Sequence, residues 1–219
     1  MASSLKIHEL IINTFQGEGF NTGRPADFIR LYGCNVGCWF CDTGYSKFDL
    51  EYNSPTFYSL TFDQIISKLK SEFVVISGGE PMLNRLLPQL CVFLLDKGKK
   101  VAIETSGTSW KEVPEEVWIT LSPKDKFSKF KTKKTAWRRA NEYKFVVSTN
   151  KPSENLPDDY KNNINPETPI FIQPEWNAYC YKIGDKDKHG RDMSEIYQLL
   201  RTLGNARLSL QTHKILGIQ

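Results

Sequence analysis

CNVGCWFC, residues 34–41, places three cysteines within eight positions, with the spacing C-x3-C-x2-C. A closed zinc site, or a [4Fe–4S] cluster held by protein alone, needs four ligands. The three histidines of the chain have no paired spacing that would complete a zinc site, and Cys91 falls within an expected helix. The remaining interpretation is a [4Fe–4S] cluster held by Cys34, Cys38 and Cys41, with one iron open to a ligand that is not protein.

The segment before the cysteines, DFIRLYG at 27–33, is the first of several short apolar runs that we expect to be strands. Most of these runs are apolar on both faces, as parallel strands covered by helices tend to be. The others lie at 73–77, 100–104, 117–121, 144–148, 170–173 and 207–210, and KIHELIINTF at 6–15 is expected to add a strand.

Helical patterns separate these strands. Thr61 and Gln64 form a capping-box start for one helix, and further helices are expected at 83–97 and 192–203, each followed by a glycine. Strands that alternate with helices indicate an α/β fold with a parallel sheet. We therefore expect one domain over residues 1–219, a partial, open β/α barrel of about six parallel strands.

Polar and glycine-rich segments follow the ends of the strands. The cysteines follow the first strand, and the segments after later strands are SGGEP (77–81), ETSGT (104–108), LSPK (121–124) and QPEWN (173–177). Ligands of such sheets bind beyond the carboxyl ends of the strands. The sequence thus predicts one site, cluster included, at the C-terminal rim.

A composition of 40% apolar, 25% charged and 12% aromatic residues is typical of a soluble globular protein. No apolar run approaches the roughly 18 residues that a membrane helix needs, and the start, MASSLKIHEL, has no signal-peptide core. We expect a cytoplasmic protein with no membrane partner and no disulfides. Cys91 is expected to pack in the core, and Cys180 has no assigned role.

Residues 124–139, KDKFSKFKTKKTAWRR, hold eight basic residues and one acidic residue, so this segment is +7 and the rest of the chain −3. Such a stretch with interleaved aromatic residues could follow a phosphate backbone. A solvated loop, or a cover over an anionic small molecule, is the better interpretation, because nucleic-acid modules spread their charge over a face. No nucleic-acid partner is expected.

The cysteine spacing, with Phe40 before the third cysteine, resembles the signature of the radical S-adenosylmethionine enzymes. SGGEP resembles their glycine-rich segment, in which Gly78 and Gly79 allow close backbone approach and Glu80 faces an ammonium group. The resemblance implies that S-adenosylmethionine binds the open iron and that an electron from the cluster cleaves it to a 5′-deoxyadenosyl radical.

The longer segment at 15–43 resembles the 7-carboxy-7-deazaguanine synthases, as do ISGGEP, ETSGT, LSPK, QP and LSLQTHKILGI. The resemblance runs from about residue 8 to the C-terminus. It implies a carbon–nitrogen lyase that contracts the ring of 6-carboxy-5,6,7,8-tetrahydropterin, releases ammonia and forms the deazapurine core of queuosine. A flavodoxin or ferredoxin as electron donor and a homodimer are implied in the same way.

Several side chains suit such a substrate. Arg30 could bind the pterin carboxylate through two donors, and an arginine in an apolar strand is costly to bury without an anion. Gln16 and Glu18 match the donors and acceptors of a pterin edge, with Gly17 letting backbone approach the ring. Gln16 and Glu18 could instead form a turn.

The resemblance implies further site residues. Those implied to bind the substrate are Phe15, Gln16, Gly17, Arg30, Thr105 and Gln219, the last through a terminal carboxylate, although the family usually ends in proline. Those implied to bind S-adenosylmethionine are Phe40, Cys41, Asp42, Gly107, Ser122, Pro123, Lys124, Gln173, Pro174, Glu175 and Trp176. Thr43 matches the family's Mg²⁺ ligand, but it could also cap a helix.

Two other functions remain open from the sequence. One is an activase that installs a glycyl radical on a partner protein, although FQGEG and Arg30 would then be unexplained. The other is a non-catalytic Fe–S or zinc module that binds RNA through residues 124–139. A change in the cluster's EPR spectrum on addition of S-adenosylmethionine would exclude the second.

Overall fold

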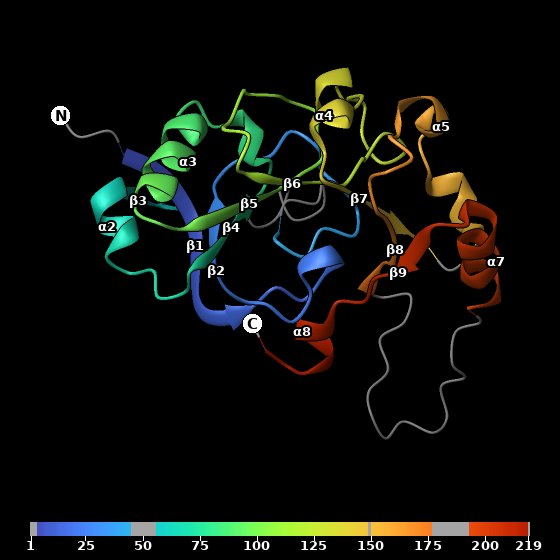
Figure 1. Ribbon diagram of the computed structural model, residues 1–219, viewed down its shortest axis with the longest axis horizontal. Helices are drawn as coiled ribbons and strands as arrows, with labels where there is room; N and C mark the ends of the chain where they lie inside the picture. Colours follow the sequence, from blue (N-terminus) through green and yellow to red (C-terminus); the bar gives the residue numbers. More distant parts are fainter. Residues whose placement is uncertain (1–3, 45–55, 149, 177–192, 219) are drawn as a thin grey trace.

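The computed structural model describes residues 4–44, 56–148, 150–176 and 193–218. Its centre is one sheet with the strand order β3-β1-β2-β4-β5-β6-β7-β8-β9 (Figure 1). The strands are β1 (Ser4–Phe15), β2 (Pro25–Leu31), β3 (Tyr58–Thr61), β4 (Phe73–Gly78), β5 (Lys100–Thr105), β6 (Trp118–Leu121), β7 (Glu142–Val147), β8 (Ile170–Pro174) and β9 (Ala206–Leu208).

The strands from β2 through β4 to β9 are parallel to their neighbours, and β1 is antiparallel to both β2 and β3. The sheet is open and mostly parallel, which confirms the predicted α/β class. The seven apolar runs expected as strands and the added N-terminal strand are all present, so the parallel part has seven strands where about six were expected. The edge strand β3 was not predicted, because its four residues, YSLT, are only partly buried and have no long apolar run.

The helices are α2 (Phe62–Ile66), α3 (Leu87–Asp96), α4 (Lys134–Arg139), α5 (Tyr160–Asn163), α7 (Ser194–Leu203) and α8 (Thr212–Ile215), with 3-10 turns η1 (Gly19–Asn21), η2 (Pro81–Leu83) and η3 (Pro152–Asn155). Figure 1 shows α3, α4 and α5 along one side of the sheet and α8 on the other. The core forms where buried residues of α2 and α3 meet the first strands, and those of α4 and α7 meet β7 and β8.

Local sequence signals account for most helix ends. Thr61 and Gln64 form the predicted capping box of α2, and Gly98 and Gly204 follow α3 and α7 with positive φ. The expected helix at 83–97 begins later, at Leu87, because Pro81–Leu83 forms η2 first. Cys91 is fully buried in the core, as predicted.

The basic segment at 124–139 is only partly the loop that we expected. Its last six residues form α4, in which Ala136 and Trp137 are buried against β6 and β7. Ala136 and Trp137, the apolar pair in this charged segment, therefore form the buried face of a short amphipathic helix. None of the helices in the described part of the chain has the length and apolar character that crossing a membrane requires.

The register of the parallel strands brings the functional segments to one rim. Leu31 is paired with Gly78, and Thr105 with Leu121, so their strands end level with each other. The cysteine segment, SGGEP, ETSGT and LSPK follow those four ends. The predicted grouping at the C-terminal rim is confirmed.

Candidate active site

A cavity of about 480 Å³ opens at this rim, a size that is ordinary for a small-molecule site. The residues predicted for the site that line it are Phe15, Gln16, Glu18, Cys34, Cys38, Phe40, Cys41, Asp42, Thr43, Gly78, Gly79, Glu80, Thr105, Ser122, Lys124, Gln173, Glu175 and Trp176. Gly17, Arg30, Gly107, Pro123 and Pro174 adjoin lining residues or contact them without lining the cavity themselves. Gln219 and Cys180 lie outside the described residues.

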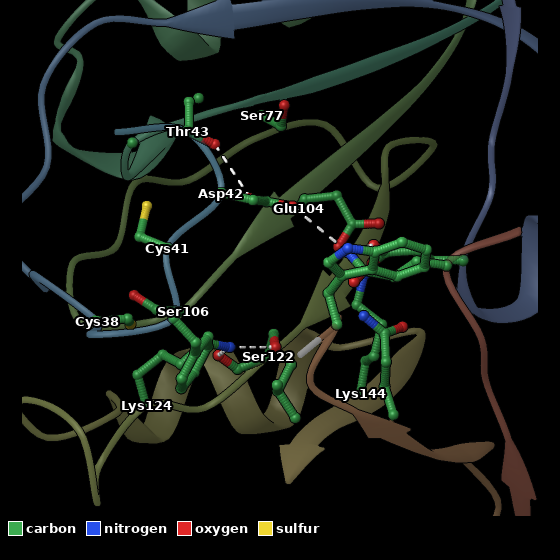
Figure 2. A pocket seen from close by; sticks show the side chains of 18 of the residues that line it. Cys38, Cys41, Asp42, Thr43, Ser77, Glu104, Ser106, Ser122, Lys124 and Lys144 are labelled. Carbon is green, nitrogen blue, oxygen red and sulfur yellow. Dashed lines mark hydrogen bonds and ion pairs between the residues drawn. The ribbon is translucent and has the colours of Figure 1, made fainter. Parts of the chain in front are cut away.

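The three cysteines come from one loop after β2. Figure 2 shows Cys41, Asp42 and Thr43 in order along this loop, and all three line the cavity. The backbone N–H of Cys41 donates to Cys38 O at 3.2 Å, which closes a turn between them. Burial raises the pKa of Cys34, and it raises that of Cys38 to about 11, so both are thiols until a metal displaces the proton. Among the described residues, no three metal-ligating side chains already converge as a complete site.

The glycine-rich segment after β4 packs against the backbone that leads to the cysteines. Gly79 N donates to Leu31 O, and Glu80 N donates to Gly33 O at 2.9 Å. A Cβ added at Gly79 would lie 2.1 Å from Gly33 O and 2.7 Å from the Cβ of Cys34. The close backbone approach predicted at Gly79 is therefore a contact with Gly33 and Cys34 of the protein itself. This contact places the cysteine loop beside the cavity.

Glu80 holds the next strand end in place. Its buried carboxylate accepts from Met82 N, Thr105 Oγ1, and both the backbone and the hydroxyl of Ser106. Burial raises the pKa of Glu80 although these hydrogen bonds oppose the rise. Because its oxygens already have four donors, its role in facing an ammonium group stays a prediction.

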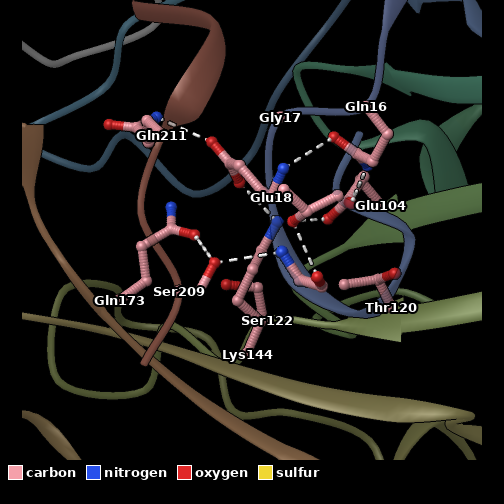
Figure 3. Close-up of polar contacts among 12 residues, drawn as sticks. Gln16, Gly17, Glu18, Glu104, Thr120, Ser122, Lys144, Gln173, Ser209 and Gln211 are labelled. Atoms are coloured by element: carbon pink, nitrogen blue, oxygen red, sulfur yellow. Dashed lines mark hydrogen bonds and ion pairs between the residues drawn. The ribbon is translucent and has the colours of Figure 1, made fainter. Parts of the chain in front are cut away.

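A buried charge network that the sequence did not reveal forms the floor of the cavity (Figure 3). Lys144 Nζ lies 2.5 Å from a Glu18 oxygen and 2.8 Å from a Glu104 oxygen. Gln16 donates to the other oxygen of Glu104 at 3.0 Å, and Gln211 donates to the other oxygen of Glu18 at 2.7 Å. These contacts orient Gln16 and Glu18, the two side chains predicted for the pterin edge.

The two carboxylates of this network titrate differently. Burial would raise the pKa of Glu18, but Lys144 and Gln211 lower it to about 2. Burial raises the pKa of Glu104 to about 6, because repulsion from Glu18 and Glu142 adds to burial and offsets much of the Lys144 attraction. The pKa of Lys144 is raised by both carboxylates in spite of its burial. Lys144 therefore keeps Glu18 ionised, but it does not offset the burial of Glu104, whose pKa stays above its usual value.

Arg30 stands at the edge of the cavity. Its guanidinium donates to Thr43 Oγ1 at 3.2 Å, and its Nε lies 3.6 Å from a Glu9 oxygen. That Nε is buried without a hydrogen-bond partner among the described residues. Glu9 is thus a partial counter-ion that the sequence did not predict, and the unused donor fits an anion that arrives with the ligand.

The segment α8 closes the cavity from the C-terminal side. Thr212 N donates to Gly17 O at 3.0 Å, and a Cβ at Gly17 would lie 2.1 Å from His213 Nδ1. His213 and Lys214 line the cavity, and Lys214 binds Asp42 at 2.6 Å. Burial would raise the pKa of Asp42, but Lys214 lowers it. The missing side chain of Gly17 therefore leaves room for the His213 ring, whereas the sequence analysis expected it to leave room for the pterin ring.

Sequence reasoning missed Glu104, Lys144, Gln211 and His213. Lys144 lies in the apolar run KFVVS, so the cost of burying a charge, which singled out Arg30, applied to it equally. Glu104 begins the quoted segment ETSGT at a strand end. Gln211 and His213 gave no local signal, since their partners lie far away in the sequence.

Comparison with known proteins identifies the family. The family described as Radical SAM superfamily matches residues 28–122. A 7-carboxy-7-deazaguanine synthase of Rickettsia prowazekii is 36% identical over 222 residues, which cover 95% of this chain and 87% of the relative. The chain belongs to the 7-carboxy-7-deazaguanine synthase family.

Further relatives of this family agree. The 7-carboxy-7-deazaguanine synthase of Synechocystis is 34% identical, with 94% of this chain and 90% of the relative covered. The crystal structure of QueE from Escherichia coli superposes with a TM-score of 0.74 at 29% identity and covers 94% of this chain and 93% of that chain. The predicted family, fold and enzyme class are confirmed.

Enzymes of this family use a [4Fe–4S] cluster, S-adenosylmethionine and Mg²⁺. The described residues fit these groups. Three thiols line one cavity, and no fourth cysteine of the described part of the chain lines it. The glycine segment beside the cysteine loop lines it too. The Thr43 hydroxyl offers one hard oxygen, which suits a metal that keeps most of its ligands from water and substrate.

Proposed function

We propose that this chain converts 6-carboxy-5,6,7,8-tetrahydropterin to 7-carboxy-7-deazaguanine, with ring contraction and release of ammonia, in queuosine or related deazapurine biosynthesis. The observation that carries the proposal is that one cavity brings together the cysteine triplet and the Gln16–Glu18 segment. The bound cluster and S-adenosylmethionine supply the radical that starts the reaction. The protein's own part is to bind and orient the pterin beside them.

The substrate would lie against the charge network. Gln16 and Glu18 are held by Glu104, Lys144 and Gln211, so they present a fixed donor and acceptor pattern. Arg30, with its unused Nε, would bind the carboxylate. Phe15 and Thr105 would complete the pocket, and the expected role of Gln219, which lies outside the described residues, stays a prediction.

The cofactors would lie on the opposite wall. Cys34, Cys38 and Cys41 would hold the cluster, and Thr43 would bind Mg²⁺. Because Arg30 donates to that same hydroxyl, a cation there would be favoured only with a substrate carboxylate beside it. The proposed S-adenosylmethionine contacts are Phe40, Cys41, Asp42, Gly78, Gly79, Glu80, Gly107, Ser122, Pro123, Lys124 and Gln173 to Trp176.

Three further features belong to this proposal. A flavodoxin or ferredoxin supplies electrons, the enzyme is a cytoplasmic homodimer, and residues 1–219 form a single domain. The resemblance supports the first two, and the continuous sheet from β3 to β9 supports the third.

The test is anaerobic reconstitution followed by turnover with dithionite, S-adenosylmethionine, Mg²⁺ and the carboxylated tetrahydropterin. We expect 7-carboxy-7-deazaguanine by mass spectrometry, and a change in the EPR spectrum of the reduced cluster when S-adenosylmethionine is added. Arg30→Lys keeps the charge but loses the donor fork, so kcat/KM should fall by tens-fold or more. A reconstituted enzyme that cleaves S-adenosylmethionine but leaves the pterin unchanged would refute the substrate assignment.

A further inference from the structure

The basic loop, which we define as residues 126–134, forms an exposed and strongly cationic surface. Its five lysines, Lys126, Lys129, Lys131, Lys133 and Lys134, are all exposed. Lys126 is paired with Asp158. Within the described ranges the other four have no ion-pair partner, so their charge is available to a second molecule.

The basic loop is held in one shape. The Asp125 carboxylate accepts from the backbone N–H of Thr132 at 3.1 Å and from its hydroxyl, which closes the loop on itself. Lys133 N donates to Gly107 O at 2.8 Å, which ties the loop to the rim of the cavity. The lysines are therefore presented by a fixed scaffold, in contrast to the solvated segment that the sequence suggested.

The basic loop also touches the cysteine loop. The Phe127 ring packs edge-on against Phe40, with centroids 4.9 Å apart, and Phe40 directly precedes Cys41. Trp39 also packs edge-on against Phe40, with centroids 5.3 Å apart, and is 61% exposed. The exposed Trp39, between two cluster cysteines, is therefore linked to the basic loop through the Phe40 ring. A polar, charged rim around an apolar contact is the usual anatomy of a protein interface.

We propose that the basic loop and Trp39 form the docking face for a small acidic one-electron carrier protein. The inference rests on the proposed function, which requires electrons to reach the cluster one at a time. In the docked complex the carrier loses one electron and the cluster gains it; no atoms are exchanged. Opposite charges would speed the encounter and orient the carrier with its redox group toward the cysteine loop.

The same lysines could in principle attract RNA, but the arrangement favours a protein carrier. The charge is confined to one short loop, whereas a nucleic-acid site follows a backbone over a longer face. The loop that carries the charge also contacts, through Phe127 and Phe40, the segment that holds the cluster cysteines, which is where an electron must enter.

The experiment measures binding of a recombinant flavodoxin and of a recombinant ferredoxin to the reconstituted enzyme by calorimetry at low and high salt. Lys129→Glu/Lys131→Glu reverses two charges of the basic loop. Lys68→Glu/Lys70→Glu makes the same charge change on exposed residues before β4, at the opposite end of the parallel strands. We expect at least one carrier to bind wild type and the control alike and more weakly at high salt, and the loop variant to bind about tenfold more weakly or worse.

Turnover with dithionite separates this inference from the proposed function, since a small reductant needs no docking face. All three proteins should form product with dithionite, and the loop variant alone should show a raised KM for the carrier. Equal carrier binding by the loop variant and the control would overturn the inference, as would the absence of salt-dependent binding to both carriers. Loss of tRNA binding in the loop variant with carrier binding unchanged would overturn it in favour of RNA. Product absent from all three with dithionite would refute the proposed function, while the binding result would still stand.

Discussion

Lys144 carries a positive charge that is almost completely buried between Glu18 and Glu104. Removing one member of a buried ionic group leaves an uncompensated charge, which costs about 3–5 kcal/mol. We therefore expect Lys144→Met to lower the free energy of unfolding by about that amount, as measured by urea denaturation. Lys70→Met, at an exposed position, should change it by less than about 0.5 kcal/mol.

A second substitution separates the charge effect from packing. Adding Glu104→Gln to Lys144→Met removes one of the stranded carboxylates, so the double variant should recover part of the lost stability. If the double variant is less stable than the single one, the cost lies in packing of the lysine chain and not in the charges.

Glu104 also predicts how stability depends on pH. Its pKa is about 6 in the folded protein and 4.5 in the unfolded chain. Between these values the folded state binds the extra proton, so this group stabilises the protein as the pH falls. A shift of 1.5 pKa units is worth about 2 kcal/mol in full, and roughly 1 kcal/mol of it falls between pH 7 and pH 5.

The matching experiment compares wild type with Glu104→Gln. Wild type should gain about 1 kcal/mol relative to the variant between pH 7 and pH 5. Glu18 does not interfere, because its pKa of about 2 places its contribution, which is lost on acidification, below pH 4.5. A difference between the two proteins that stays constant over this range would contradict the raised pKa of Glu104.

The cysteines give the third prediction at this scale. Alanine at Cys34, Cys38 or Cys41 removes one of three thiolates, and we expect the reconstituted protein to lose both its brown colour and its formation of 5′-deoxyadenosine. Cys91 is buried in the core away from the cavity, so Cys91→Ala should keep both. Visible absorbance and chromatography of the nucleoside are the measurements. A colourless Cys91→Ala protein, or a Cys38→Ala protein that still forms 5′-deoxyadenosine, would be the contrary result.

At the scale of elements, Gly17 sets the position of α8. Gly17→Ala would place a Cβ 2.1 Å from His213 Nδ1 and 2.9 Å from the His213 backbone N. Because a backbone atom is involved, α8 itself must move away from the cavity. We expect faster hydrogen exchange over residues 211–216 and a higher KM for the pterin, with the strands of the sheet unchanged.

A double variant identifies which contact matters. Gly17→Ala/His213→Ala removes the clash with the ring but keeps the clash with the backbone, so hydrogen exchange at α8 should be only partly restored. Full restoration would show that the ring alone sets the distance between the two segments.

The limits of sequence reasoning also lie at this scale. The strands other than β3, the capping box of α2 and the C-terminal rim could be predicted, because apolar runs and glycine positions are local signals. The contact between Gly17 and α8 could not, since it joins residues 195 apart in the chain. Arg30 and Lys144 illustrate the same limit. The sequence shows that each charge lies in an apolar strand, where its burial is costly. It does not show their partners, Glu9, Glu18 and Glu104, which only the folded sheet brings near.

At the scale of the whole molecule, the cavity joins distant parts of the chain. Its wall begins with Ile11 and Phe15 of β1, continues through the ends of β4, β5 and β7, and finishes with His213 and Lys214 of α8. A ligand that fills it contacts both halves of the sheet, whose hydrophobic cores form two separate main clusters. Ligand binding should therefore stabilise the protein as a unit.

The size of this effect follows from mass action. S-adenosylmethionine at about 100 times its Kd adds about 2.7 kcal/mol to the free energy of unfolding, which for a chain of this size raises Tm by about 5–10 °C. Anaerobic thermal unfolding of the reconstituted protein, followed by circular dichroism, is the measurement. Cys91→Ala keeps the three cluster thiols and should show the same rise, whereas Cys38→Ala lacks the open iron that the cofactor binds and should show little. An equal rise in both variants would mean that the cofactor binds without the cluster, and that the cysteine loop is not what anchors it.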